Sequence, residues 1–256
     1  MADAARTWRK VPEVTVYFWI VKVLTTAMGE ATSDYLVHLI DPVIAVTLAG
    51  VALVAALGLQ LLVRRYIAWI YWLAVVMVAI FGTMAADVLH IRFGVPYWVS
   101  ATMFACALGV IFFTWYHTEK TLSIHSIYTP RRELFYWATV LATFALGTAV
   151  GDLTAYTFGL RFLASGILFT VVIAIPVLAR RLVGLNEVAT FWFAYIVTRP
   201  LGASFADWMG VPHNLGGLNL GRGTVSLGLS VLIVGFVAYL SVTRVDAETA
   251  PATPAT

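Results

Sequence analysis

The segment FWIVKVLTTAMGEATSD at residues 18–34 recurs three more times along the chain. Its later copies are YWLAVVMVAIFGTMAAD at 71–87, YWATVLATFALGTAVGD at 136–152 and FWFAYIVTRPLGASFAD at 191–207. An aromatic residue, a tryptophan, a glycine, a small residue and an aspartate keep the same spacing in every copy, although the residues between them diverge. Self-similarity at a fixed spacing indicates a repeat architecture.

The composition of the chain indicates an integral membrane protein. Hydrophobic residues make up 61% of it and charged residues only 11%, with a mean hydropathy of +0.89, whereas soluble domains carry about 25% charged residues. Apolar runs long enough to cross a membrane as helices occupy residues 14–37, 43–63, 66–90, 97–116, 134–158, 161–179, 188–209 and 224–242. The sequence therefore predicts an all-α integral membrane protein with eight transmembrane helices.

Two predicted spans make one repeat. The repeats cover residues 10–65, 66–121, 131–181 and 185–242, within a single transmembrane domain at 1–242. Because each repeat holds an even number of spans, all of them enter the membrane in the same direction, as parallel repeats with pseudo-fourfold or nested twofold symmetry. The first apolar run is too long for a cleavable signal peptide, so the first helix is expected to stay in the mature protein. The polar stretch at 243–256 predicts a disordered cytoplasmic tail.

Basic residues are distributed unevenly between the two sets of loops. Arg92, Arg161 and Arg222 lie on one side, and the side of the two termini carries Arg6, Arg9, Lys10, Arg64, Arg65, Lys120, Arg131, Arg132, Arg180, Arg181 and Arg244. Because cytoplasmic loops carry an excess of Lys and Arg, both termini are predicted to be cytoplasmic. No soluble domain is predicted that would carry a nucleic-acid site, so nucleic-acid binding is not expected. Cys106, the only cysteine, cannot form an intramolecular disulfide.

The first helix of each repeat is predicted to lie at the centre of the protein. Each repeated glycine and the small residue four positions later form a ridge that lets helices pack closely in lipid, whereas the second helix of each repeat has few ionisable groups and should face lipid. The tryptophans are expected near the cytoplasmic headgroups, where indole rings are favoured. Each aspartate follows its tryptophan by 15 residues, roughly 22 Å along the helix axis, so the carboxylates share one depth toward the outer side.

Repeated acids in very apolar sequence predict a cation site, because ionisable groups in a membrane usually face an interior or a water-filled cavity. Like charges cannot all ionise in a shared low-dielectric site, so such a site holds protons or binds cations. Carboxylate oxygens suit Mg²⁺, Mn²⁺ or Ca²⁺, and a nitrogen from His38 or His90 would suit Mn²⁺, Zn²⁺ or Ni²⁺. Alternatively, each aspartate is hydrated near the outer interface or caps a break in its helix. The predicted metal ligands are Asp34, Asp87, Asp152, Asp207 and Glu30.

Two charges in these helices have no counterpart in the other repeats. Glu30 lies four residues before the first aspartate, and Arg199 lies eight residues before the last, where the first repeat has Thr26. Because one helical turn, roughly 6 Å, separates Glu30 from Arg199 in depth, the sequence predicts an ion pair between them; alternatively, Arg199 pairs with an aspartate or a backbone carbonyl. Lys22 can reach the cytoplasmic interface. A series at i+4 spacing could also line a path: Lys22, Thr26, Glu30, Asp34 and His38.

The segments KVPEVTVYFWIVKVLTTAMGEATSDYL at 10–36 and FWFAYIVTRPLGASFADW at 191–208 resemble a family of bacterial membrane proteins. Its members consist of four tandem copies of a two-helix repeat of unknown function, each marked by a tryptophan, which here is Trp19, Trp72, Trp137 and Trp192. The resemblance covers about residues 10–242. It implies eight transmembrane helices in a bacterial inner membrane, and it implies no function.

The functional prediction therefore rests on the acidic residues. They predict a transporter of cations, such as the divalent metal ion Mn²⁺ with proton coupling, or its close variant, an ion channel. Asp34 is expected to matter most because Glu30 is nearby, and Asp152 least because its repeat has no nearby histidine or second acid. No cofactor is expected apart from a bound divalent metal ion. The expected partners are the lipid bilayer, metal cations or protons, and further copies of the chain in a homo-oligomer.

Two other classes of function remain open on the sequence. The first is a non-transporting membrane scaffold or partner subunit, whose acids lock the helices together. The second is an intramembrane enzyme that uses carboxylates as acid and base. Because the chain has no metalloprotease motif, no nucleophile elbow and no Cys/His pair, enzymatic activity is not expected.

Overall fold

The structure, a computed structural model, describes residues 9–247. Within this range the chain is all-α, without β-strands. Its eight long helices are α1 (Val16–Leu39), α2 (Pro42–Leu62), α3 (Ala68–Asp87), α4 (Tyr97–Glu119), α5 (Pro130–Asp152), α6 (Arg161–Val183), α7 (Glu187–Gly210) and α8 (Arg222–Thr243). Six of them, all except α1 and α7, are long and apolar enough to cross a membrane. The two exceptions carry the charged residues Lys22, Glu30 and Arg199.

Polar residues in the loops set the starts of several helices. The carboxylate of Asp41 accepts hydrogen bonds from the backbone N–H groups of Val43 and Ile44, and Pro42 occupies the first turn of α2. Asn186 caps α7 through two backbone N–H groups in the same way. Such caps satisfy N–H groups that have no partner inside the helix. Short polar loops therefore separate the helices, even though the chain is apolar almost throughout.

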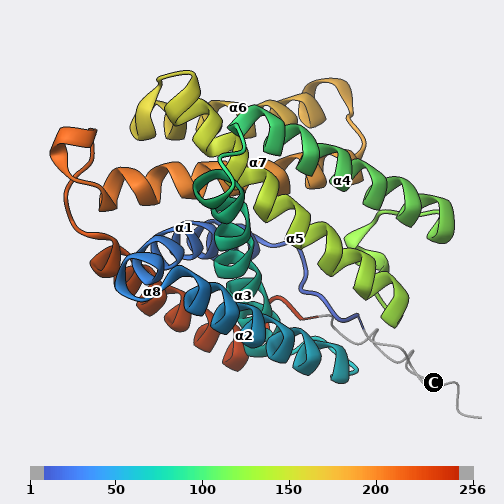
Figure 1. Cartoon of the computed structure of the whole chain (residues 1–256). Coiled ribbons are helices and arrows are strands. Elements are labelled where there is room, and N and C mark those ends of the chain that lie inside the picture. Colours follow the sequence, from blue (N-terminus) through green and yellow to red (C-terminus); the bar gives the residue numbers. More distant parts are fainter. Residues whose placement is uncertain (1–8, 248–256) are drawn as a thin grey trace, which may run out of the picture.

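Four helices form a closed ring at the centre of the molecule (Figure 1). Helix α1 contacts α3, α3 contacts α5, α5 contacts α7, and α7 contacts α1. Each of the other four packs mainly against the first helix of the next repeat: α2 on α3, α4 on α5, α6 on α7, and α8 on α1. The most apolar stretches of α3 and α5 are 56% and 67% buried, against 17–28% for α2, α4, α6 and α8. The predicted division into central and outer helices is confirmed.

The same repeat positions meet at all four junctions of this ring. Each repeated glycine faces the residue three positions before the glycine of the next repeat, and a methyl group there would collide with it. The aromatic residue before each tryptophan likewise lies against the tryptophan of the next repeat, with ring centroids 5.5–6.2 Å apart. The glycine pairs are Gly29 with Ala79, Gly82 with Phe144, Gly147 with Arg199, and Gly202 with Thr26.

Gly202→Ala is therefore expected to destabilise the protein by about 1–3 kcal/mol, the usual cost of overpacking. A Cβ atom at this position would lie 2.8 Å from the backbone nitrogen of Ala27, which has little freedom to move. Gly109→Ala in α4 is the matched control, because a Cβ atom there meets nothing within 4 Å. Equilibrium unfolding in mixed micelles measures both variants. Equal stability of the two would contradict the close approach of α7 and α1.

Three of the four repeat tryptophans are buried inside the bundle, so their indole rings pack against protein, and the depth expected for them near the headgroups stays a prediction. Trp72, Trp137 and Trp192 are at most 4% exposed. They pack against the aromatic residues of the neighbouring repeats, and the indole N–H of Trp192 donates to the carbonyl of Leu122 at 2.8 Å. Large aromatic rings stabilise most where they are buried against other rings. Only Trp19 remains partly exposed.

Both described ends of the chain lie on the side of the bundle where the central helices begin, here called the terminal side. The backbone N–H of Glu13 donates to the carbonyl of Asp246 at 2.8 Å, and Tyr66 donates its hydroxyl to the Asp246 carboxylate at 2.5 Å. Asp246 is 1% exposed. The predicted disorder is therefore wrong for residues 243–247, because Tyr66 and Glu13 supply partners for polar groups there. The rest of that predicted tail, 248–256, lies outside the described residues.

Candidate cation site

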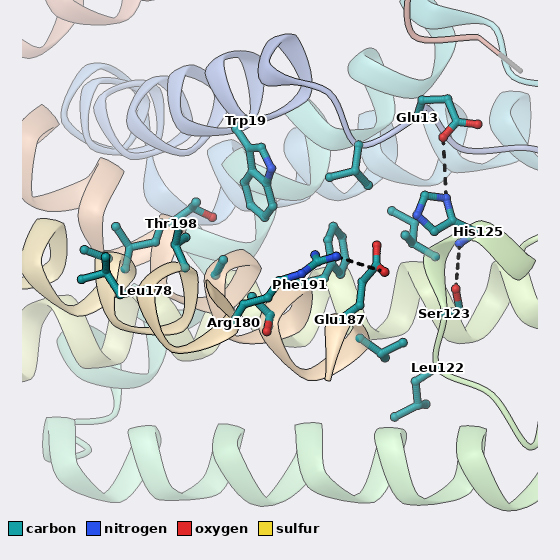
Figure 2. A pocket seen from close by; sticks show the side chains of 18 of the residues that line it. Glu13, Trp19, Leu122, Ser123, His125, Leu178, Arg180, Glu187, Phe191 and Thr198 are labelled. Carbon is teal, nitrogen blue, oxygen red and sulfur yellow. Dashed lines mark hydrogen bonds and ion pairs between the residues drawn. The ribbon is translucent and has the colours of Figure 1, made fainter. Parts of the chain in front are cut away.

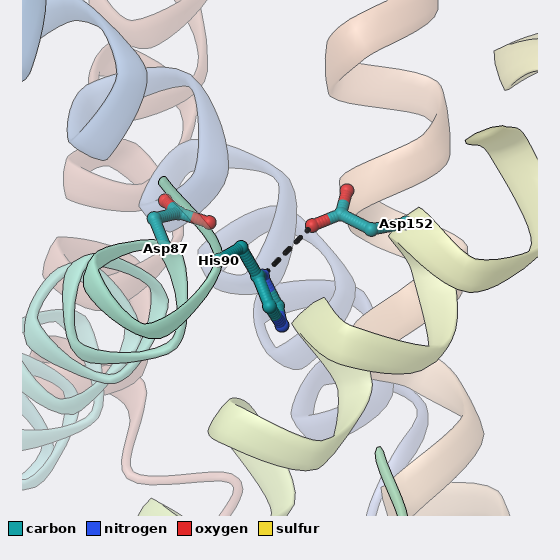
Figure 3. A group of neighbouring side chains, drawn as sticks. All are labelled: Asp87, His90 and Asp152. Carbon is teal, nitrogen blue, oxygen red and sulfur yellow. Dashed lines mark ion pairs between the residues drawn. The ribbon is translucent and has the colours of Figure 1, made fainter. Parts of the chain in front are cut away.

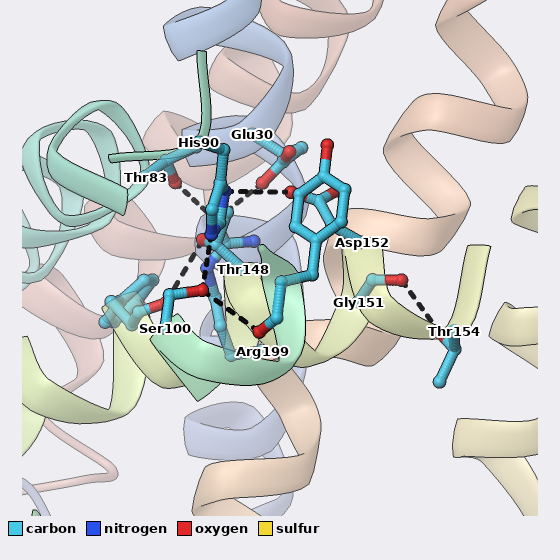
Figure 4. Close-up of polar contacts among 11 residues, drawn as sticks. Glu30, Thr83, His90, Ser100, Thr148, Gly151, Asp152, Thr154 and Arg199 are labelled. Atoms are coloured by element: carbon cyan, nitrogen blue, oxygen red, sulfur yellow. Dashed lines mark hydrogen bonds and ion pairs between the residues drawn. The ribbon is translucent and has the colours of Figure 1, made fainter. Parts of the chain in front are cut away.

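Arg199 forms the predicted ion pair with Glu30 at the centre of the helix ring (Figure 4). Its Nη2 atom lies 2.5 Å from Glu30 Oε2, donates to Thr148 Oγ1 at 2.7 Å, and also donates to Thr83. The three acceptors occupy the same repeat position in α1, α5 and α3. Arg199 is 0% and Glu30 4% exposed. One arginine from α7 therefore joins all four central helices.

Lys22 also lies at the centre of the helix ring, closer to the terminal side than Arg199. Its side chain is 1% exposed, and its Nζ atom lies 4.1 Å from the ring centroids of both Phe144 and Tyr195. The prediction that Lys22 reaches the interface is therefore wrong, because the aromatic rings of neighbouring repeats hold the ammonium by cation–π interactions. With Arg199, these side chains fill the centre of the ring.

Asp87, Asp152 and His90 lie close together near the C-terminal ends of α3 and α5, farther from the terminal side than the buried side chains of Lys22 and Arg199 (Figure 3). One possible ligand atom from each of the three residues lies within 4.8 Å of the others. His90 Nδ1 is 3.7 Å from Asp152 Oδ2, and the two side chains are 4% and 15% exposed. The site is therefore largely covered by protein and lies between two central helices of neighbouring repeats.

Two π-helices position this site. One follows Asp87 directly (Val88–Arg92) and contains His90, and the other follows Asp152 directly (Leu153–Thr157). A π-helix widens the turn and changes the direction of the side chains that follow, and such turns occur often at functional sites. The first and fourth repeats have no π-helix after their aspartates within the described residues. The second and third repeats therefore differ from the others at the place where their acids meet.

Ser100 orients the ring of His90. Its hydroxyl donates to the carbonyl of Tyr97 at 3.0 Å, and with that proton engaged its oxygen accepts from an Nε2–H of His90 at 2.6 Å. A neutral imidazole with its proton on Nε2 presents a lone pair at Nδ1. That atom is buried, makes no hydrogen bond within the described residues and faces Asp152. Two acceptors that face each other repel, so this geometry suits a proton or a metal ion between them.

The other predicted ligands lie outside this group. Asp34 Oδ2 accepts from Arg222 Nε at 2.8 Å, and Glu30 is held by Arg199. The side chain of Asp207 has no hydrogen bond or ion pair within residues 9–247. Of the five acids predicted as metal ligands, the structure brings two, Asp87 and Asp152, together with His90. Arginines from other elements pair with Asp34 and Glu30.

Two further predicted residues serve the helices themselves. His38 is exposed, and its Nδ1 atom lies 2.6 Å from the backbone carbonyl of Asp34. Thr26 donates to the carbonyls of Val23 and Thr198 at 2.7 and 3.1 Å, which links α1 to α7. Neither side chain belongs to the group around His90.

Sequence reasoning missed Ser100 and Arg222. Arg222 is one of three basic residues in the loops opposite the termini, which is a weak signal for a partner of an acid. Ser100 is a polar residue near the start of an apolar run and carries no recognisable pattern. The expected ranking of the aspartates also changes. Asp152 has a histidine after all, supplied by the neighbouring repeat, whereas Asp34 has an arginine.

Comparisons with known proteins agree with the repeat structure. Neither the curated proteins nor the solved structures contain a match to this chain. Residues 17–66, 70–121, 135–184 and 190–246 each match one family, and each match spans one central helix and the outer helix after it. The four matches cover most of the chain, which therefore belongs to the family described as Repeat of Unknown Function (DUF347).

Proposed function

We propose that the protein is a membrane transporter for a divalent cation such as Mn²⁺, coupled to protons. In this proposal all eight helices cross a bacterial inner membrane as four parallel repeats with pseudo-fourfold symmetry, and both termini are cytoplasmic. The cation binds between α3 and α5, toward the outer side. The protein is not an enzyme in this proposal, and a bound metal ion is cargo rather than a cofactor.

The buried Nδ1 atom of His90 beside two carboxylates carries this proposal. Two oxygen donors and one imidazole nitrogen suit Mn²⁺ or Zn²⁺ better than Mg²⁺ or Ca²⁺, which favour oxygen alone. The hydrogen bond from His90 to Ser100 resembles the outer contacts that orient histidines at metal sites. Three protein ligands also leave coordination positions for water, so the ion can enter and leave.

The same ligands would couple metal movement to protons. Metal binding requires deprotonated carboxylates and a neutral imidazole with a free lone pair, so bound metal and bound protons exclude each other. Exchange of one for the other at a single site is the simplest basis for antiport. The proton-coupled form of the proposal therefore needs no second site.

Buried side chains fill the centre of the helix ring, which supports a carrier rather than an open channel. Arg199, Lys22, Phe144 and Tyr195 are each at most 1% exposed and separate the site from the terminal side. An ion bound at His90 can therefore reach that side only if the central helices move. The alternative, a membrane scaffold, draws support from the pairing of Asp34 and Glu30 with arginines, but it gives no role to the acceptors around His90.

Flux measurements in proteoliposomes test the proposal. Purified protein should move Mn²⁺ or Zn²⁺ faster than Mg²⁺, and an opposing proton gradient should accelerate uptake. Asp34→Asn should retain transport, because Asp34 pairs with Arg222 and lies outside the group around His90. Protein-free liposomes and a proton ionophore are the controls. If no divalent cation moves faster than in protein-free liposomes, the transporter proposal is wrong and the scaffold alternative gains support.

A further inference from the structure

A large apolar cavity opens on the terminal side between α1, α6 and α7 (Figure 2). Its volume is about 1100 Å³, at or above the upper end of the roughly 300–1,000 Å³ typical of small-molecule pockets. Trp19, Val23, Ile173, Val177, Leu178 and Phe191 supply much of its apolar wall. This cavity is separate from the group around His90, so what it binds does not depend on cation transport.

The cavity lies where the repeat symmetry fails. The end of α4 covers Trp192, because Phe112 and Trp115 lie 5.2 and 5.8 Å from its ring. Repeat symmetry would place the end of α6 against Trp19, just as the end of α4 lies against Trp192. However, no side-chain hydrogen bond, ion pair or aromatic pair joins α6 to α1 among the described side chains. The lining stretch of α6 contains Pro176, which removes a backbone hydrogen bond and tends to bend a helix.

The mouth of the cavity carries charges of both signs. Arg180 Nη2 lies 3.3 Å from Glu187 Oε2, and His125 Nδ1 lies 3.7 Å from Glu13 Oε2. Arg180 and Glu187 are 50% and 62% exposed, so they remain accessible. Figure 2 shows Thr198 at the opposite end of the cavity from His125. A zwitterionic headgroup, with a phosphate for Arg180 and an ammonium for the carboxylates, complements this arrangement.

The length of the cavity matches one leaflet of a membrane. Glu187 and Thr198 both line it and are 11 residues apart on α7, roughly 16 Å along the helix. Half of a hydrocarbon core of about 30 Å is similar in depth. We propose that the cavity binds one molecule of a zwitterionic phospholipid such as phosphatidylethanolamine, with its acyl chains against Trp19 and α6 and its headgroup between Arg180 and Glu187.

Native mass spectrometry of the delipidated full chain tests this site by titration with phosphatidylethanolamine and with phosphatidylglycerol of the same acyl chains. One phosphatidylethanolamine should bind per chain, more tightly than phosphatidylglycerol. Ala174→Trp fills the cavity from an exposed position on α6 and should weaken binding at least about tenfold. Ala55→Trp, at an exposed position on α2 outside the cavity, is the control and should leave binding unchanged.

A double variant at Arg180 and Glu187 tests the position proposed for the lipid headgroup. Arg180→Gln combined with Glu187→Gln should weaken phosphatidylethanolamine binding by about 1.5-fold to fivefold, the range of exposed ion pairs, and should remove the preference over phosphatidylglycerol. Equal binding of both lipids to the parent would overturn the proposal, as would phosphatidylethanolamine binding that survives Ala174→Trp. If Ala174→Trp instead abolishes a dimer without changing lipid binding, the cavity is a contact between copies of the chain and the proposal fails.

Discussion

Glu30→Gln is expected to lower the free energy of unfolding by about 3–5 kcal/mol, the usual cost of removing one partner from a buried ion pair. The variant keeps the size of the side chain but leaves the guanidinium of Arg199 without a counter-charge. Arg199 is fully buried, and its Nε and Nη1 atoms have no hydrogen-bond acceptor within the described residues. Thr83 and Thr148 can accept hydrogen bonds from the guanidinium, but they cannot neutralise it.

Glu30→Gln combined with Arg199→Met should recover most of this loss. The double variant removes both charges together, and a buried ion pair is often replaceable by apolar groups without loss of stability. Equilibrium unfolding of the parent, both single variants and the double variant in mixed micelles gives the coupling energy. Arg131→Gln is the control, because its 3.3 Å pair with Glu119 is 65% exposed on the arginine side and should contribute less than about 1 kcal/mol. Strictly additive losses would show that Glu30 and Arg199 do not interact in the folded protein.

The pairing of Glu30 with Arg199 could be predicted from the sequence because a membrane interior gives an unpaired charge few alternatives. Only one repeat has a second acid, and only one has a base at that depth. The counter-charge for Glu30 therefore had to come from another repeat. The spacing along each helix fixed the depth at which the side chains of Glu30 and Arg199 would meet. The division into central and outer helices followed from the same repeats, since small residues and charges occur together on the first helix of each.

The partners of the aspartates could not be predicted in this way. Spacing along one helix says nothing about which neighbouring element lies beside it, so the contact of His90 with Asp152 was not visible in the third repeat itself. Arg222 reaches Asp34 from the first residue of α8, an outer helix that packs against α1 only because the ring closes. The π-helices after Asp87 and Asp152 also have no pattern in the sequence. Because of these tertiary contacts, the four aspartates, which occupy equivalent positions in the sequence, have different partners in the structure.

Asp152→Asn is expected to weaken Mn²⁺ binding by at least about 100-fold, which corresponds to the loss of roughly 2.7 kcal/mol. An amide keeps the shape of the side chain but lacks the negative charge that a hard cation needs. Asp87→Asn should act similarly, because its carboxylate belongs to the same group. Ser100→Ala should weaken binding about 10–100-fold without removing a ligand, as expected for a residue that orients a metal-binding histidine.

Equilibrium binding of Mn²⁺ to the purified full chain, measured by titration calorimetry on Asp152→Asn and Asp34→Asn in parallel with the parent, tests the cation site most directly. The parent and Asp34→Asn should each bind one Mn²⁺ per chain with affinities within about threefold, since Asp34 is held by Arg222. Asp152→Asn should lose binding although it remains folded. Equal binding by Asp152→Asn and the parent, or a larger loss in Asp34→Asn than in Asp152→Asn, would contradict a cation site at Asp87, His90 and Asp152.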